Sequence, residues 1–202
     1  MFNLYSEIAG NPTHYKQFRC GESLLSIYNC PLKSKYEDTW SQYNYIIYVV
    51  EGRKIWHMAH GSYDLREGSC VFVRKGATIV EQFFETRFCF FLFFVPDEFI
   101  CEVLKSKATP LPKPKEQYEP VITISKNATT VAFFQTMMIY FNSDYVPDQY
   151  LLKLKFSELI LTIADNPDNS VLQCYFSSLL QEPQSVSLQR IMDDNFCFNL
   201  KL

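Results

Sequence analysis

Histidine is the first residue type to consider for metal chemistry, and His57 and His60 lie close together in this sequence. Two imidazoles spaced by two residues on a strand would face the same way and could share a metal ion. The spacing here places them on opposite faces, and Gly61 follows directly, which predicts that His60 lies in a turn. We therefore expect two ordinary, partly exposed histidines, no metal site and no cofactor.

The sequence offers equally little for catalysis. It contains no Gly-x-Ser-x-Gly nucleophile motif. Cys70 lies within an apolar strand pattern, which is typical of a packed thiol and not of a nucleophile. Glu51 and Asp64 border expected turns, where we predict solvated carboxylates and no acid–base pair. The expected set of catalytic residues is empty, so the chain is not expected to be an enzyme.

Composition narrows the class of protein further. The chain has 202 residues, a net charge of −3 and a pI near 5.6, so it has no general attraction to nucleic acid. Its cysteines are scattered without a Cys-x-x-Cys pair, and the N-terminus shows no secretory signal. The most apolar run, residues 88–95, is too short to span a membrane. We expect a reduced, cytoplasmic protein without membrane contact.

The elements that would position any site begin with short strands separated by turn glycines, which indicates a sandwich or barrel. The expected strands are Tyr15–Cys20, Ser23–Tyr28, Tyr43–Val50, Lys54–Met58, Cys70–Val73, Thr78–Phe84 and Arg87–Val95. The last strand is apolar on both faces, with Phe88, Phe90, Leu92 and Phe94 on one and Cys89, Phe91, Phe93 and Val95 on the other. It is therefore predicted to be central and covered on both sides.

After Pro96 the hydrophobic period becomes helical. We expect Asp97 to cap a short helix, followed by a proline-rich linker over Lys105–Pro120 and a short strand over Val121–Ile124. Further helices are expected over Val131–Phe141, Gln149–Asp165 and Ser170–Leu180. The fold class is thus mainly β with C-terminal helices (α+β), divided into residues 1–105, residues 106–181 and a tail, 184–202.

The tail carries a helical signal of its own. Ser187 can cap a helix that ends at Asn195, and its apolar face is Leu188, Ile191 and Met192. A lone amphipathic turn of this kind buries too little surface to be stable. We therefore expect the tail to be the first piece of a further domain.

The strongest helix signal, Gln149–Asp165, has apolar residues on more than one face. Its main stripe consists of Leu152, Phe156, Leu159, Ile160 and Ile163. A second set lies off this stripe: Leu151, Leu154 and Leu161. A helix that packs on its own domain needs one apolar side, so the second face predicts another partner.

Several segments together resemble a known family. They read Y-N-Y-I-I-Y-V-V-E-G (43–52), D-L-R-E-G-S-C-V-F-V-R-K-G (64–76) and F-F-L-F-F-V-P-D-E-F-I (90–100). This block resembles the N-terminal regulatory domain of AraC-type bacterial transcription regulators, and within them the ExsA-like subgroup. The segment L-L-K-L-K-F-S-E-L-I-L-T-I-A (151–164) is similar to the interdomain helix of that subgroup. The tail resembles the first helix of the family's double helix-turn-helix DNA-binding domain.

The resemblance implies a cupin-like antiparallel β-barrel followed by an α-helical dimerisation segment. It implies a homodimer formed through Leu151, Leu154 and Leu161, and control of DNA binding by a C-terminal helix-turn-helix domain that alone would contact DNA. A protein regulator or a small-molecule effector would act on the barrel, and the subgroup favours the protein. The alternative is a stand-alone cupin enzyme or a small-molecule-binding cupin.

The aromatic residues of the expected strands could either surround a cavity or fill the interior of the domain. A set of them could line a cavity for a small apolar or sugar-like ligand: Tyr43, Tyr45, Tyr48, Trp56, Phe72 and Phe83. The same side chains could instead close the interior, as in small barrels. We expect the filled core. The sequence does not indicate which residues would bind a ligand.

Overall fold

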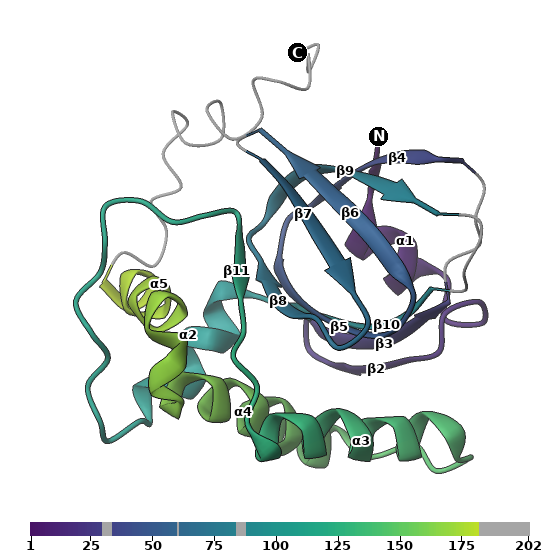
Figure 1. Ribbon diagram of the computed structural model, residues 1–202. Helices are drawn as coiled ribbons and strands as arrows, with labels where there is room; N and C mark the ends of the chain where they lie inside the picture. The colour runs from purple at the N-terminus through teal and green to yellow at the C-terminus, as the bar shows by residue number, and fades with distance from the viewer. Residues whose placement is uncertain (30–33, 60, 84–87, 182–202) are drawn as a thin grey trace.

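The computed structural model describes residues 1–29, 34–59, 61–83 and 88–181, which contain eleven strands. They are β1 (Phe2–Asn3), β2 (Gln17–Cys20), β3 (Ser23–Asn29), β4 (Tyr36–Ser41), β5 (Asn44–Glu51), β6 (Arg53–Met58), β7 (Gly61–Arg66), β8 (Cys70–Val73), β9 (Gly76–Gln82), β10 (Cys89–Val95) and β11 (Val121–Thr123). A five-stranded sheet has the order β1-β4-β9-β6-β7 and a six-stranded sheet the order β11-β8-β5-β10-β3-β2. The two sheets face each other (Figure 1), and we call this part the two-sheet domain.

Helices follow the sheets in the sequence. They are α2 (Asp97–Lys105), α3 (Ala128–Asn142), α4 (Gln149–Asp165) and α5 (Ser170–Gln181), with a 3-10 turn η1 (Pro167–Asn169) before α5. All four helices lie on the side of the six-stranded sheet (Figure 1). A short helix near the N-terminus, α1 (Leu4–Gly10), instead contributes Tyr5 and Ile8 to the core between the sheets. The domain therefore has one core between its sheets and a second between the six-stranded sheet and the helices.

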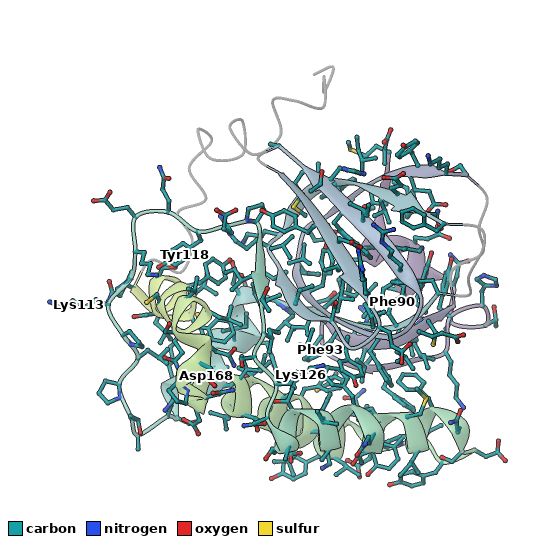
Figure 2. The ribbon with its side chains drawn as sticks, in the orientation of Figure 1. Phe90, Phe93, Lys113, Tyr118, Lys126 and Asp168 are labelled. Carbon is teal, nitrogen blue, oxygen red and sulfur yellow. The ribbon has the colours of Figure 1, made fainter. Side chains whose placement is uncertain are left out.

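Strand β10 separates the two cores. It pairs with β5 on one side and β3 on the other. Phe90, Leu92 and Phe94 belong to the core between the sheets, whereas Phe91 and Phe93 belong to the core beneath the helices. The side chains of Phe90 and Phe93 can be followed in Figure 2. The prediction of a central strand covered on both faces is confirmed, because successive side chains of a strand point to opposite faces.

The predicted class, mainly β with C-terminal helices, is confirmed. Among the described residues no strand pairing joins the two sheets into one closed barrel, and β1 pairs with β4 in parallel. The sequence pattern did not predict β1, α1, β4 or β7. The prediction that Asp97 caps α2 is wrong: Pro96 occupies the cap position without a side-chain hydrogen bond, and the Asp97 carboxylate is used elsewhere.

Two expectations lie outside the described residues. They are the turn at His60 and the tail helix Ser187–Asn195. The structure bears on membrane association in one respect: none of the helices in the described ranges combines the length and the apolar character that crossing a bilayer requires.

Candidate functional site

His57, the first candidate for metal chemistry, is engaged with protein partners at both ring nitrogens. Its Nε2 lies 2.9 Å from Glu81 Oε2, and its Nδ1 lies 2.7 Å from Ser62 Oγ. These contacts join β6 to β9 and β7 across the five-stranded sheet. Within the described ranges no three His, Cys, Asp or Glu side chains gather into a group that could hold a metal ion. The His57 ring therefore links three strands of the five-stranded sheet.

Asp64 is exposed, as expected, but it lies within a strand and is paired with two arginines. It lies within β7, and its carboxylate accepts hydrogen bonds from Arg53 Nε at 2.7 Å and from Arg66 Nη2 at 2.6 Å. Hydrogen bonds from these two guanidinium groups, first that of Arg53, lower the pKa of Asp64 from its ordinary value of 3.8 to about 2. The carboxylate is thus held charged by two cations, which makes it a poor general acid or base near neutral pH.

This pKa predicts the acid response of the domain. The Asp64 pKa is lowered on folding, so its ion pairs contribute stability above pH 3.8, and this stability is lost as the pH falls towards about 2. Carboxyl-carbon NMR should show Asp64 titrating near pH 2. In Asp64→Asn, the free energy of unfolding should vary less with pH across this window. A carboxyl that titrates near 3.8 would contradict the prediction.

Cys70, the candidate thiol, is a packed residue. It is buried on β8 in the core beneath the helices, and burial raises the pKa of its thiol to about 12. A thiol protonated at neutral pH is a poor nucleophile. The buried position supports the packing role that the apolar strand pattern indicated.

The six aromatic residues expected to surround an interior divide between different places. Tyr45 and Trp56 face the core between the sheets, whereas Phe72 belongs to the core beneath the helices. Phe83 follows the end of β9 and lies under the Arg53 guanidinium, 4.7 Å from its ring centroid. The interior pocket that Tyr45 and Trp56 line measures about 30 Å³, room for a water-sized molecule or two. The described side chains therefore favour a filled core.

Lys54 is an interior residue that the sequence reading missed. Its side chain is buried between the sheets, where Nζ donates to Gln82 Oε1 at 3.0 Å and lies 4.9 Å from the centroid of the Phe88 ring. The available signal was strand periodicity, because Lys54 stands two residues before the inward-facing Trp56 on β6. Because lysine is charged, the apolar pattern alone did not indicate that this position faces the interior.

Helix α4 confirms the predicted main stripe. Leu152, Phe156, Leu159, Ile160 and Ile163 are all buried in the core beneath the helices. The second set is divided: Leu154 is 52% exposed, whereas Leu161 is partly buried and packs against this core. Other large apolar side chains are exposed on or near the α3–α4 connection, and together with Leu154 we call them the hairpin patch: Ile139, Tyr145, Val146 and Tyr150.

A polar cluster fastens the helices to the two-sheet domain, and we call it the Asn44 junction. Asn44 and Tyr175 are buried in it, whereas Lys75 and Asp97 are partly buried. Asn44 Nδ2 donates to Asp97 Oδ1 at 2.6 Å, and Asn44 Oδ1 accepts from the Lys75 backbone N–H at 3.0 Å and from the Tyr175 hydroxyl at 3.2 Å. Lys75 Nζ donates to Asp97 Oδ2 at 2.6 Å. The junction thus joins β5, the β8–β9 turn, α2 and α5 through four side chains.

Comparisons with known proteins agree with this architecture. Apo ToxT from Vibrio cholerae has a TM-score of 0.54 at 12% identity, covering 84% of this chain and 69% of its own. At that identity the likeness shows the fold alone. A second ToxT structure from Vibrio cholerae gives a TM-score of 0.46 at 10% identity, over 84% of this chain and 69% of its own. The EutQ protein of Clostridium difficile gives 0.34 at 20% identity, over 41% of this chain and 66% of its own.

No curated protein matches the sequence. The model of the ExsA N-terminal regulatory domain matches residues 44–175, from the first residue of β5 to Tyr175 in α5. The match covers more than half of the chain and includes all four residues of the Asn44 junction. The chain therefore belongs to the ExsA N-terminal regulatory domain family.

Proposed function

We propose that this domain regulates transcription by dimerising and thereby controlling an AraC-type helix-turn-helix DNA-binding domain. The observation that carries the proposal is the hairpin patch, an exposed apolar surface in a domain of a regulatory family. The chemistry is binding and not turnover, since His57 and Asp64 are engaged in bracing contacts and Cys70 is buried.

The geometry of α4 supports a second copy of the chain as the partner. Leu154 and Tyr150 are four residues apart and therefore share a face, which lies opposite the buried stripe around Phe156 and Leu159. Tyr150 is 72% exposed, so burying this face would remove large apolar side chains from water. A two-fold dimer brings the same patch of both copies together and needs no other complementary surface.

Dimerisation would control DNA binding by fixing the distance between two DNA-binding domains. Paired helix-turn-helix units read half-sites separated by a fixed number of helical turns, so the arrangement of the dimer sets which sites can be bound. An effector would shift this arrangement by binding one form more tightly than the other. The net charge of −3 fits a division of labour in which DNA contacts belong to the DNA-binding domain.

Leu154→Glu tests the dimer. The substitution should weaken dimerisation at least about 100-fold, because it places an unpaired charge in an apolar contact. Sedimentation equilibrium of the purified chain measures the change. Val171→Glu is the matched control, since Val171 is also exposed but lies on α5, outside the hairpin patch. Leu161→Glu is a poorer probe because Leu161 packs against the domain's own core.

The proposal requires that the unmodified chain and Val171→Glu sediment as dimers at the same concentration at which Leu154→Glu is monomeric. Circular dichroism would establish that all three proteins are folded. A Leu154→Glu protein that keeps the dimer, or an unmodified chain that stays monomeric at about 100 μM, would refute dimerisation through this face.

A further inference from the structure

The hairpin patch is centred on the connection between α3 and α4. Tyr145 and Val146 lie within this connection, and Ile139 and Tyr150 flank it. The two helices run side by side, and their connection lies at the end of the hairpin away from α5 (Figure 1). The position of the patch therefore depends on what holds this end of the hairpin.

The C-terminal end of α3 has backbone carbonyls that find no partner within the helix, as at every helix end. Helices commonly meet this need with a glycine after the last turn or with a basic residue in that turn. Here the connection, residues 143–148, contains no glycine, and the last turn of α3 contains no basic residue. The end of this helix therefore takes a donor from elsewhere in the chain.

Lys16 supplies that donor from the two-sheet domain, just before β2. Its Nζ donates to the Phe141 carbonyl at 2.5 Å and to the Ser143 carbonyl at 3.0 Å. A cation at the C-terminal end of a helix also interacts favourably with the helix dipole. In the described part of the chain, these are the hydrogen bonds that join the end of α3 to the two-sheet domain.

The Lys16 backbone is itself attached to the six-stranded sheet. Its carbonyl accepts a hydrogen bond at 2.9 Å from the hydroxyl of Ser26, a buried residue of β3. Two residues along the chain, the Phe18 ring centroid lies 4.4 Å from that of Phe141. Apolar contact is not directional, whereas hydrogen bonds require defined distances and angles. Phe18 thus provides burial, and Lys16 fixes the position of the helix end.

We propose that Lys16 is a positioning residue for the dimer: by holding the end of α3, it fixes where the hairpin patch lies on the domain. This inference rests on the proposed function, which makes the patch the dimer surface. Lys16 acts through backbone carbonyls of α3 and the connection, and not through a side chain of the patch. A two-fold interface needs both patches in one matching geometry. If the helix end were released, association would have to order it, and the dimer would be weaker.

Lys16→Met tests this role, because it removes the ammonium group and keeps an apolar side chain of similar length. Hydrogen exchange is first compared in the Leu154→Glu background, so that dimerisation does not contribute. Exchange of the backbone amides of residues 143–152 should rise about fivefold. Lys16→Arg should keep most of the protection, since a guanidinium also donates hydrogen bonds. Lys35→Met is the matched control: it makes the same change in net charge, but Lys35 is paired with Glu81 of the five-stranded sheet.

Sedimentation equilibrium without the Leu154→Glu change then measures the dimer. Lys16→Met should raise its Kd about fivefold, whereas Lys16→Arg and Lys35→Met should stay within about twofold of the unmodified chain. The positioning role is overturned if exchange does not change in Lys16→Met, if Lys35→Met has the same effect, or if the Kd does not respond to Lys16→Met. An unmodified chain that stays monomeric refutes the proposed function instead, and the exchange measurement still decides whether Lys16 holds the end of α3.

Discussion

Phe93→Ala is expected to lower the free energy of unfolding by about 3–5 kcal/mol. Phe93 is fully buried on β10, and its ring centroid lies 4.6 Å from that of Phe156 on α4. Truncation would remove apolar contacts and leave a cavity between the six-stranded sheet and the helices, because both surrounding layers are held by other contacts. Urea unfolding followed by circular dichroism measures the loss.

Phe83→Ala is the matched control for this loss. Phe83 is only partly buried, so its truncation should cost less than half as much. The two faces of β10 also predict different local effects. Phe93→Ala should raise hydrogen exchange in α4, whereas Phe90→Ala should act on the core between the sheets. A cost below about 1 kcal/mol for Phe93→Ala would mean that β10 does not join the two cores as described.

Elements with strong apolar periodicity could be predicted from the sequence. The two apolar faces of β10 and the buried stripe of α4 both follow from where side chains point on a strand or a helix. Asp148 and Asn166 mark the ends of α4 as capping residues, and the predicted bounds Gln149–Asp165 agree with the structure. Such local signals need no knowledge of partners elsewhere in the chain.

Elements with weak apolar signals were missed. In β4 the buried positions are Thr39 and Ser41, and in β7 the one buried side chain is Leu65, so neither strand shows an apolar alternation. Helix α1 spans seven residues, too few for a clear helical period. These strands belong to the five-stranded sheet, whose outer face lies away from the helices (Figure 1). Their pairing with neighbours decides their structure.

The candidate sites depend on distant pairings that one sequence does not show. Asn44 and Tyr175 are 131 residues apart, and each has an ordinary local context. In the sequence, Arg74 is a charged residue that follows an expected strand. Such a residue is usually exposed to solvent. The structure buries it because the linker carbonyl of Tyr118 and the ring of Tyr175 close over the guanidinium. The burial of Arg74 becomes apparent only when these segments meet in the folded chain.

Asn44→Ala is expected to lower the free energy of unfolding by about 2–4 kcal/mol and to loosen α5. Asn44 is fully buried, and its removal would deprive Asp97, the Lys75 backbone N–H and the Tyr175 hydroxyl of a shared partner. Buried polar groups that lose their partners cost more than the hydrogen bonds themselves contribute. Thermal or urea unfolding measures the total loss, and hydrogen exchange locates it.

The control for Asn44→Ala is Asn11→Ala, because Asn11 is exposed and its side chain donates a single hydrogen bond, to the Glu7 carbonyl. Its cost should stay within about 1 kcal/mol. Combining Asn44→Ala with Tyr175→Phe should cost less than the sum of the single changes, since both remove the same hydrogen bond. Additive losses, or unchanged exchange in α5, would show that the junction does not hold α5.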